Sequence, residues 1–241
     1  MRSCLILCSN ANEEDFAAAL DCGADALLLR LGPCVEDDAR RSASARACTL
    51  IGEAKRKGGA PKLFVEVAPV ESELIEADLG ALFGPGPDGV FLPSCRGVES
   101  LQRLAVKLAV REAQAGLADG ATRIGAFVGD PASVLALRFF AAASPRLAAL
   151  AFDEAALSAS LGLTEAGGAA IEMARAAIIL AAASAGVPAF APPVQIGQEA
   201  AYAAARRDGF AGAMALRPEQ VAHILKVFPP GENRQKGQSS A

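Results

Sequence analysis

Short hydrophobic runs alternate along the chain with longer stretches whose apolar and polar positions follow helical spacing. Apolar runs bounded by Gly, Pro, Asp or Asn are typical of strands that are buried on both faces. The pattern predicts strands at residues 4–8, 26–29, 62–67, 89–93, 124–128, 147–152, 187–191 and 213–216. It predicts helices at residues 13–21, 39–57, 98–115 and 198–207, after Pro69, Pro131 and Pro218, and as two pieces separated by residues 162–168.

Strands that each precede a helix indicate parallel βα units, and eight such units favour an α/β fold of the (β/α)8 TIM-barrel type. An open doubly wound sheet usually stops at five or six strands, and no GxGxxG motif follows the first strand. We therefore expect one barrel domain over residues 1–230. Residues 231–241 are polar and lack periodicity, which predicts a disordered tail.

Composition narrows the classes of partner. Hydrophobic residues make up 52% of the chain and charged residues 21%, with a formal net charge of −4. No basic stripe is interleaved with aromatic residues, so nucleic acid is not an expected partner. The Ala-rich run at residues 176–195 is broken by Gly186 and Pro188, which favours a buried helix followed by a strand over a membrane span.

The N-terminal residues do not resemble a signal peptide, and the six cysteines contain no CxxC pair. Reduced cysteines in apolar segments are typical of a cytoplasmic protein, which is the location we expect. The basic pair Arg40-Arg41 predicts a solvated outer face on the second helix.

Several short segments of the sequence are similar to motifs of a known protein family. The segments concerned are residues 23–29 (GADALLL), 89–93 (GVFLP), 185–189 (AGVPA), 209–212 (GFAG), 217–221 (RPEQV) and 228–230 (FPP). In order and spacing they resemble the citrate-lyase-β-like branch of the HpcH/HpaI aldolase/citrate lyase family, across residues 2 to about 232. The resemblance implies a carbon–carbon lyase, aldolase or thioesterase that acts on 2-oxo or 3-hydroxy acids or their coenzyme A thioesters. It also implies a homo-oligomer, a magnesium ion held by Glu and Asp, and a substrate-binding Arg on the third strand.

The chain departs from the family at those functional positions. Arg30 replaces an acidic residue after the second strand, and Glu66 replaces the third-strand Arg. Ser94 stands where the family has Lys, while Gly129 and Ala156 stand where it has metal-binding acids. Because a hard cation needs carboxylate oxygens, no metal or other cofactor is expected, and the pattern predicts a pseudoenzyme or strongly altered catalysis.

The remaining candidates follow strands and should gather at the mouth of the barrel. They are Arg30, Glu66, Ser94, Asp130, Asp153 and Glu154. Arg30 and Glu66 either form an ion pair that plugs the pocket or provide a rewired anion site. The three last acids either cap the following helices or bind a cation.

Thiol chemistry has weaker support in the sequence. Cys8, Cys34 and Cys95 each follow a predicted strand, but His223, the only histidine, lies in the last helix and is not expected to activate them.

Two classes of function stay open from the sequence. In the first, the barrel is catalytically silent and binds a small carboxylic acid, a coenzyme A thioester or an active paralogue. In the second, it is a divergent metal-dependent lyase or acyl-CoA thioesterase that holds magnesium with Asp130, Asp153 or Glu154.

Overall fold

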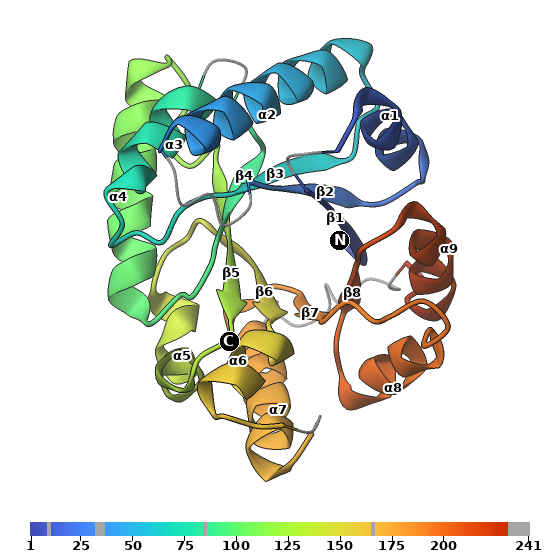
Figure 1. Cartoon of the computed structure of the whole chain (residues 1–241). Helices are drawn as coiled ribbons and strands as arrows, with labels where there is room; N and C mark the ends of the chain where they lie inside the picture. The colour runs from blue at the N-terminus through green and yellow to red at the C-terminus, as the bar shows by residue number, and fades with distance from the viewer. Residues whose placement is uncertain (9–10, 32–36, 84–85, 165–166, 231–241) are drawn as a thin grey trace, which may run out of the picture.

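A computed structural model of the chain describes residues 1–8, 11–31, 37–83, 86–164 and 167–230. Eight parallel strands pair in sequence order and close into one barrel (Figure 1). The fold is therefore a (β/α)8 barrel. Its strands are β1 (Ser3–Cys8), β2 (Ala26–Arg30), β3 (Lys62–Glu66), β4 (Gly89–Leu92), β5 (Arg123–Val128), β6 (Leu147–Phe152), β7 (Ala189–Ala191) and β8 (Gly212–Ala215).

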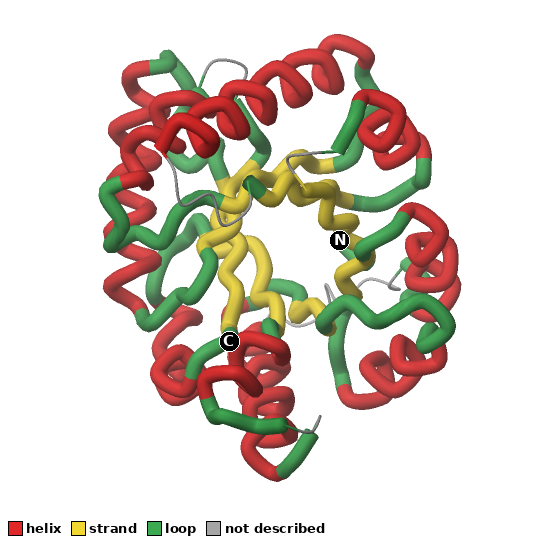
Figure 2. The backbone as a smooth tube through the Cα atoms, viewed as in Figure 1, coloured by secondary structure: helices red, strands yellow, loops and turns green. Residues whose placement is uncertain are grey.

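Helices surround the closed sheet on its outer side (Figure 2). They are α1 (Glu13–Asp21), α2 (Asp37–Lys57), α3 (Leu74–Leu82), α4 (Val98–Gln114), α5 (Pro131–Ala136), the 3-10 helix η1 (Leu137–Ala142), α6 (Glu154–Ser160), α7 (Ala169–Ala185), α8 (Ala200–Asp208) and α9 (Pro218–Val227). No helix in the described part of the chain is long and apolar enough to cross a membrane.

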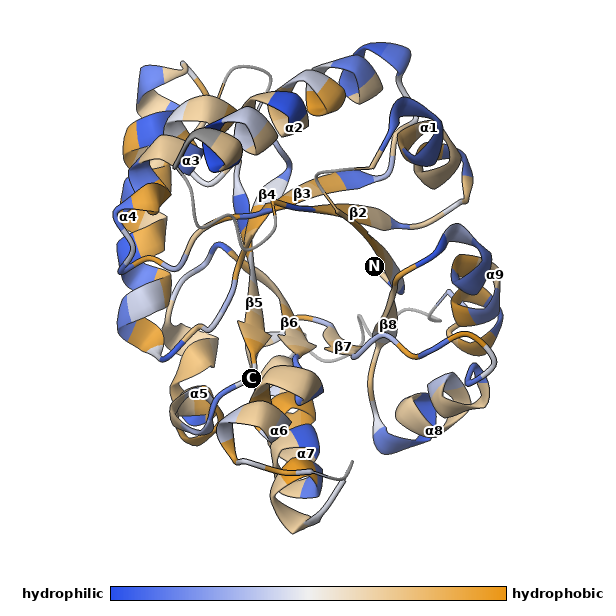
Figure 3. Cartoon of the chain, viewed as in Figure 1, coloured by the Kyte–Doolittle hydropathy of each residue, from blue (hydrophilic) through white to orange (hydrophobic). Residues whose placement is uncertain are grey.

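Alternate strand residues build two apolar layers. The strands are accordingly coloured mostly as hydrophobic in Figure 3. One layer fills the space between the strands and the helices. The other fills the barrel interior with residues that include Leu28, Phe64, Phe91 and Phe127. Gly125 makes room for this interior layer, because a Cβ there would lie 2.4 Å from the Phe91 ring. The barrel is thus packed below its mouth.

The predicted boundaries need two corrections around β7. The strand begins at Ala189 rather than residue 187, because Gly186 ends α7 in the left-handed conformation and the Val187 amide donates to the Ala182 carbonyl at 3.0 Å. Helix α8 begins at Ala200 rather than residue 198. The predicted tail, residues 231–241, lies outside the described residues, as does Cys34.

Candidate functional site

The mouth of the barrel carries an ion pair between two neighbouring strands. Arg30 and Glu66 are paired in register at the ends of β2 and β3. Both lie two residues beyond an interior side chain, Leu28 or Phe64, so both point inward. Arg30 Nε donates to Glu66 Oε2 at 2.8 Å, and the Arg30 guanidinium carbon lies 5.6 Å from the centre of the Phe127 ring. The Arg30–Glu66 ion pair expected as one of two alternatives is therefore formed, but it does not plug the pocket, because Arg30 lines two cavities.

Two cavities meet at this ion pair. The larger, of about 720 Å³, extends from Arg30 toward α6, α7 and the loop after β7. The smaller, of about 360 Å³, extends from Arg30 and Glu66 toward Pro69 and Pro93. Both cavities are lined by Arg30, Phe127 and Asp153. Of the other predicted site residues, Glu66 lines the smaller cavity and Glu154 the larger one, whereas Ser94 and Asp130 line neither.

Asp130 and Asp153 act as helix N-caps in the structure. Asp130 Oδ1 accepts the Ser133 amide at 3.0 Å at the start of α5. Asp153 Oδ1 accepts the Ala156 amide at 3.0 Å at the start of α6. Such bonds satisfy donors that a helix start leaves free. Asp130 Oδ2 is buried and has no hydrogen-bond partner among the described residues.

Glu154 forms an ion pair with a basic residue of α7. Its Oε2 accepts from Arg175 Nη2 of α7 at 2.7 Å. The Arg175 guanidinium also lies 5.7 Å from the Phe152 ring and 5.8 Å from the Phe210 ring. Arg175 lines the larger cavity and was missed in the sequence, because it sits within a long Ala-rich helix rather than after a strand.

Ser94 stands apart from the cavities in an unusual backbone conformation. Its φ is +48°, the only positive value among the described residues other than glycine. Left-handed φ values cost free energy for residues with a Cβ. The exposed Ser94 hydroxyl therefore sits on a turn whose shape is fixed by its surroundings, beside Pro93 of the smaller cavity.

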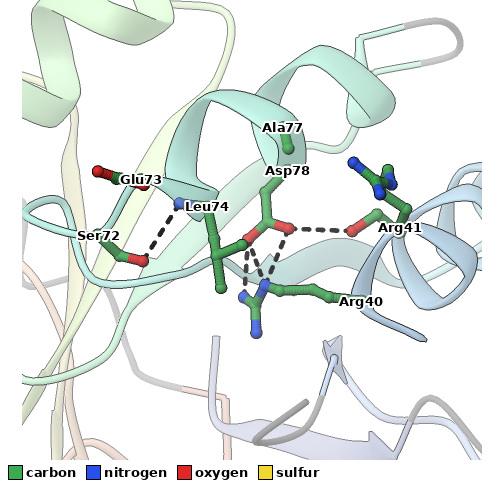
Figure 4. Close-up of a pocket in the computed structure, with 8 residues that line it drawn as sticks. Arg40, Arg41, Ser72, Glu73, Leu74, Ala77 and Asp78 are labelled. Carbon is green, nitrogen blue, oxygen red and sulfur yellow. Dashed lines mark hydrogen bonds and ion pairs between the residues drawn. The ribbon is translucent and has the colours of Figure 1, made fainter. Parts of the chain in front are cut away.

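Arg40 corrects the prediction of a solvated basic face on α2. It is only 8% exposed, and its guanidinium forms three hydrogen bonds of 2.7–3.1 Å with the Asp78 carboxylate of α3 (Figure 4). Ser44 Oγ and the Ala68 amide also donate to Asp78, at 3.1 and 2.8 Å. Since Ala68 closely follows Glu66, this buried network fixes the segment that carries the mouth ion pair.

The described cysteines do not form an activated thiol site. Burial raises the pKa of the Cys95 thiol to about 12, so it stays protonated near neutral pH. Cys8 is exposed at the end of β1, and His223 lies on the exposed face of α9. Among the described residues no group of three His, Cys, Asp or Glu side chains lies close enough to hold a metal ion.

Comparison with solved structures shows the same fold at low sequence identity. The chain is similar to RipC from Yersinia pestis, with 23% identity, a TM-score of 0.74 and 96% of each chain covered. It is also similar to the citrate lyase beta subunit of M. tuberculosis complexed with oxaloacetate and magnesium, with 20% identity, a TM-score of 0.75, and 95% of this chain and 96% of that chain covered.

A third similar structure is the Haloferax volcanii malate synthase lead(II) complex, with 15% identity and a TM-score of 0.81, covering 100% of this chain and 75% of that one. No curated protein matches the sequence significantly.

Family membership rests on the sequence itself. The model of the HpcH/HpaI aldolase/citrate lyase family matches residues 5–211, which is most of the chain. The segments that resemble this family include β2 and β4, the turns that lead into β7 and β8, and the two ends of α9. The chain therefore belongs to the HpcH/HpaI aldolase/citrate lyase family.

Proposed function

We propose that the barrel mouth binds a small carboxylic acid, free or as its coenzyme A thioester, and that the family's metal-dependent carbon–carbon lyase reaction is lost or strongly altered. The observation that carries the proposal is the Arg30–Glu66 ion pair, which occupies the strand positions where the family resemblance implies an acid and an arginine. Fold and family alone do not fix activity, so the proposal rests on these side chains.

The acids that remain do not fit a shared magnesium ion. Asp130 and Asp153 each accept an N-cap hydrogen bond, and Glu154 is paired with Arg175. Only Asp153 and Glu154 of these three line a mouth cavity. Magnesium prefers several oxygen ligands in octahedral geometry, which favours acids that converge on one point. We therefore propose that the protein has no resident metal cofactor.

A second candidate function is a divergent magnesium-dependent lyase or acyl-CoA thioesterase. Its support is that Asp153 lines both cavities and that Asp130 Oδ2 is buried with no hydrogen-bond partner in the described part of the chain. An unsatisfied buried carboxylate oxygen is costly, and a bound cation would offset that cost. The titration below separates the two functions.

Isothermal titration of metal-stripped protein with magnesium and manganese tests the proposal. The titrations are run alone and in the presence of oxaloacetate or acetyl-CoA. We expect no heat from either metal, with or without these ligands. Micromolar to low-millimolar metal binding that disappears in Asp153→Ala, and persists in the distant Glu76→Gln variant, would establish the second function instead.

The expected location, oligomeric state and domain organisation are consistent with this function. We propose a cytoplasmic protein, from the reduced cysteines, that forms a homo-oligomer, as the family resemblance implies. We propose one barrel domain, residues 1–230, followed by a polar tail.

A further inference from the structure

The donor groups of Arg30 are only partly used inside the protein. Its Nε is bonded to Glu66, and the side chain keeps 33% of its surface exposed. Within the described part of the chain, no acceptor is hydrogen-bonded to Nη1 or Nη2 of Arg30. A guanidinium that is tied through Nε and lies over an aromatic ring presents its Nη groups as a fixed fork, which suits a carboxylate.

The cavity beside this fork is larger and more apolar than a two- to four-carbon acid requires. Its volume is about 720 Å³, within the range of pockets for ligands of drug size. Apolar side chains form much of its wall, including Phe127, Phe152, Pro192, Pro193, Val194 and Leu216. Burying a small polar acid here would leave most of that wall in contact with water.

Most other charged side chains that line the larger cavity, or contact Arg30, have a partner of opposite charge. Arg175 pairs with Glu154 at 2.7 Å, and Glu66 pairs with Arg30 at 2.8 Å. Asp153 is a negative charge on the same wall, and the N-terminus of α6 offsets part of it through the Ala156 amide. A second acid group on the ligand would find no cationic partner, so the arrangement favours a ligand with one carboxylate, bound at the Nη groups of Arg30, and an uncharged body.

We infer that the larger cavity takes a monocarboxylic acid with a long apolar body, of the medium-chain fatty acid class. The carboxylate binds the Nη groups of Arg30, and the body lies against the wall formed by Phe152, Val194 and Leu216. Glu66 is a positioning residue that orients the guanidinium through Nε. The inference rests on the proposed function, since it needs a mouth that binds acids without metal.

Calorimetric titration in EDTA with octanoate, acetate, oxaloacetate and octanol tests the inference. We expect octanoate to bind at least tenfold more tightly than acetate, oxaloacetate or octanol. Arg30→Gln should weaken octanoate binding tenfold or more. The matched control is Arg138→Gln, because Arg138 also lies over a Phe ring, at 4.4 Å from Phe139, but lies outside the larger cavity. This control should bind octanoate as the wild type does.

Two further variants keep the test informative if Arg30→Gln fails to fold. Leu216→Gln should weaken octanoate binding and leave acetate binding unchanged, because it makes the apolar wall polar without adding a charge, and Leu216 lies on that wall and is 46% exposed. Asp153→Asn should strengthen octanoate binding severalfold, because Asn still caps the helix and the like charge is removed.

Each contrary result has a distinct meaning. Acetate or oxaloacetate binding as tightly as octanoate overturns the apolar ligand class and leaves the proposed function standing. Octanol binding as tightly as octanoate overturns the role of Arg30. Acid binding that is absent in EDTA and appears when the titration is repeated with magnesium in place of EDTA overturns the proposed function itself.

Discussion

At the scale of single residues, Asp78 connects two helices of the outer layer to the segment that follows β3. Its carboxylate accepts hydrogen bonds from Arg40 and Ser44 of α2 and from the Ala68 amide after β3, and it is 1% exposed. Charges this deeply buried depend on their partners, since removal of one leaves the other desolvated and unpaired.

We predict that Asp78→Asn lowers the free energy of unfolding by about 3–5 kcal/mol, because Arg40 loses its counter-charge while it stays buried. Urea unfolding followed by circular dichroism measures this change. Glu76→Gln is the control, because Glu76 also pairs with basic residues, Lys107 and Arg111, yet is 52% exposed. It should cost less than about 1 kcal/mol. Equal losses in both variants would contradict the structural role of the Asp78 network.

The burial of Arg40 could have been predicted from its position on the apolar face of α2, although the basic pair Arg40-Arg41 favoured a solvated face. From residue 39 onward, the buried positions of α2 are Arg40, Ser44, Ala47, Ile51 and Ala54, and their spacing is that of one helix face. The apolar residues on that face predict that it packs against the barrel. Arg40 lies on the same face, one turn before Ser44, and is therefore expected to be buried. Its partner Asp78 lies 38 residues away, and a long-range pairing of that kind is set by packing rather than by local pattern.

At the scale of secondary structure elements, the starts of α5 and α6 depend on their capping acids. Asp130 and Ser133 form a reciprocal capping box at the start of α5. The second carboxylate oxygen of Asp130 is buried without a partner among the described residues. The cap stabilises the helix start while the spare oxygen destabilises the folded state.

We predict that Asp130→Ala lowers the free energy of unfolding by about 0.5–2 kcal/mol, because it removes the cap. Asp130→Ser should keep the cap without the spare oxygen, so its unfolding midpoint in urea should equal or exceed that of the wild type. A magnesium titration of both variants separates this role from metal binding. If Asp130→Ser is as unstable as Asp130→Ala, the carboxylate has a role besides capping.

Strands and helices were easier to predict than the site because their signals are local. Apolar runs and Gly or Pro punctuation predicted every strand from β1 to β8, and the error at the start of β7 arose because the C-cap of α7 also uses the amide of Val187. The rule that strand ends gather at the mouth of a barrel placed Arg30 and Glu66 next to each other, as their register in the sheet shows. Arg175, by contrast, reaches the cavity from α7, and no periodicity along a helix predicts which strand end it faces.

At the scale of the whole molecule, one apolar face remains outside the barrel's own packing. Helices α5, η1 and α7 lie against one another, and Leu135, Phe139, Met173 and Leu180 are each more than half exposed on them. A shallow cavity of about 460 Å³ lies between these helices, lined by Leu135, Met173 and Leu180. Contiguous apolar patches of this kind mark association surfaces, and a second copy of the chain presents the same patch.

We predict that the protein self-associates through this face, which is the homo-oligomer of the proposed function. Sedimentation velocity at micromolar concentration should show a species larger than the 24.5 kDa chain. The double variant Leu135→Asp, Leu180→Asp should sediment as a monomer, because burying two new carboxylates in an apolar interface costs more than the contact provides. Val106→Asp is the matched control, since Val106 is 66% exposed on α4, and it should leave the oligomer intact. A monomeric wild type would contradict self-association altogether. An oligomer that survives the double variant would place the subunit contact on another face. An oligomer that dissociates in both variants would indicate that any new surface charge disrupts it.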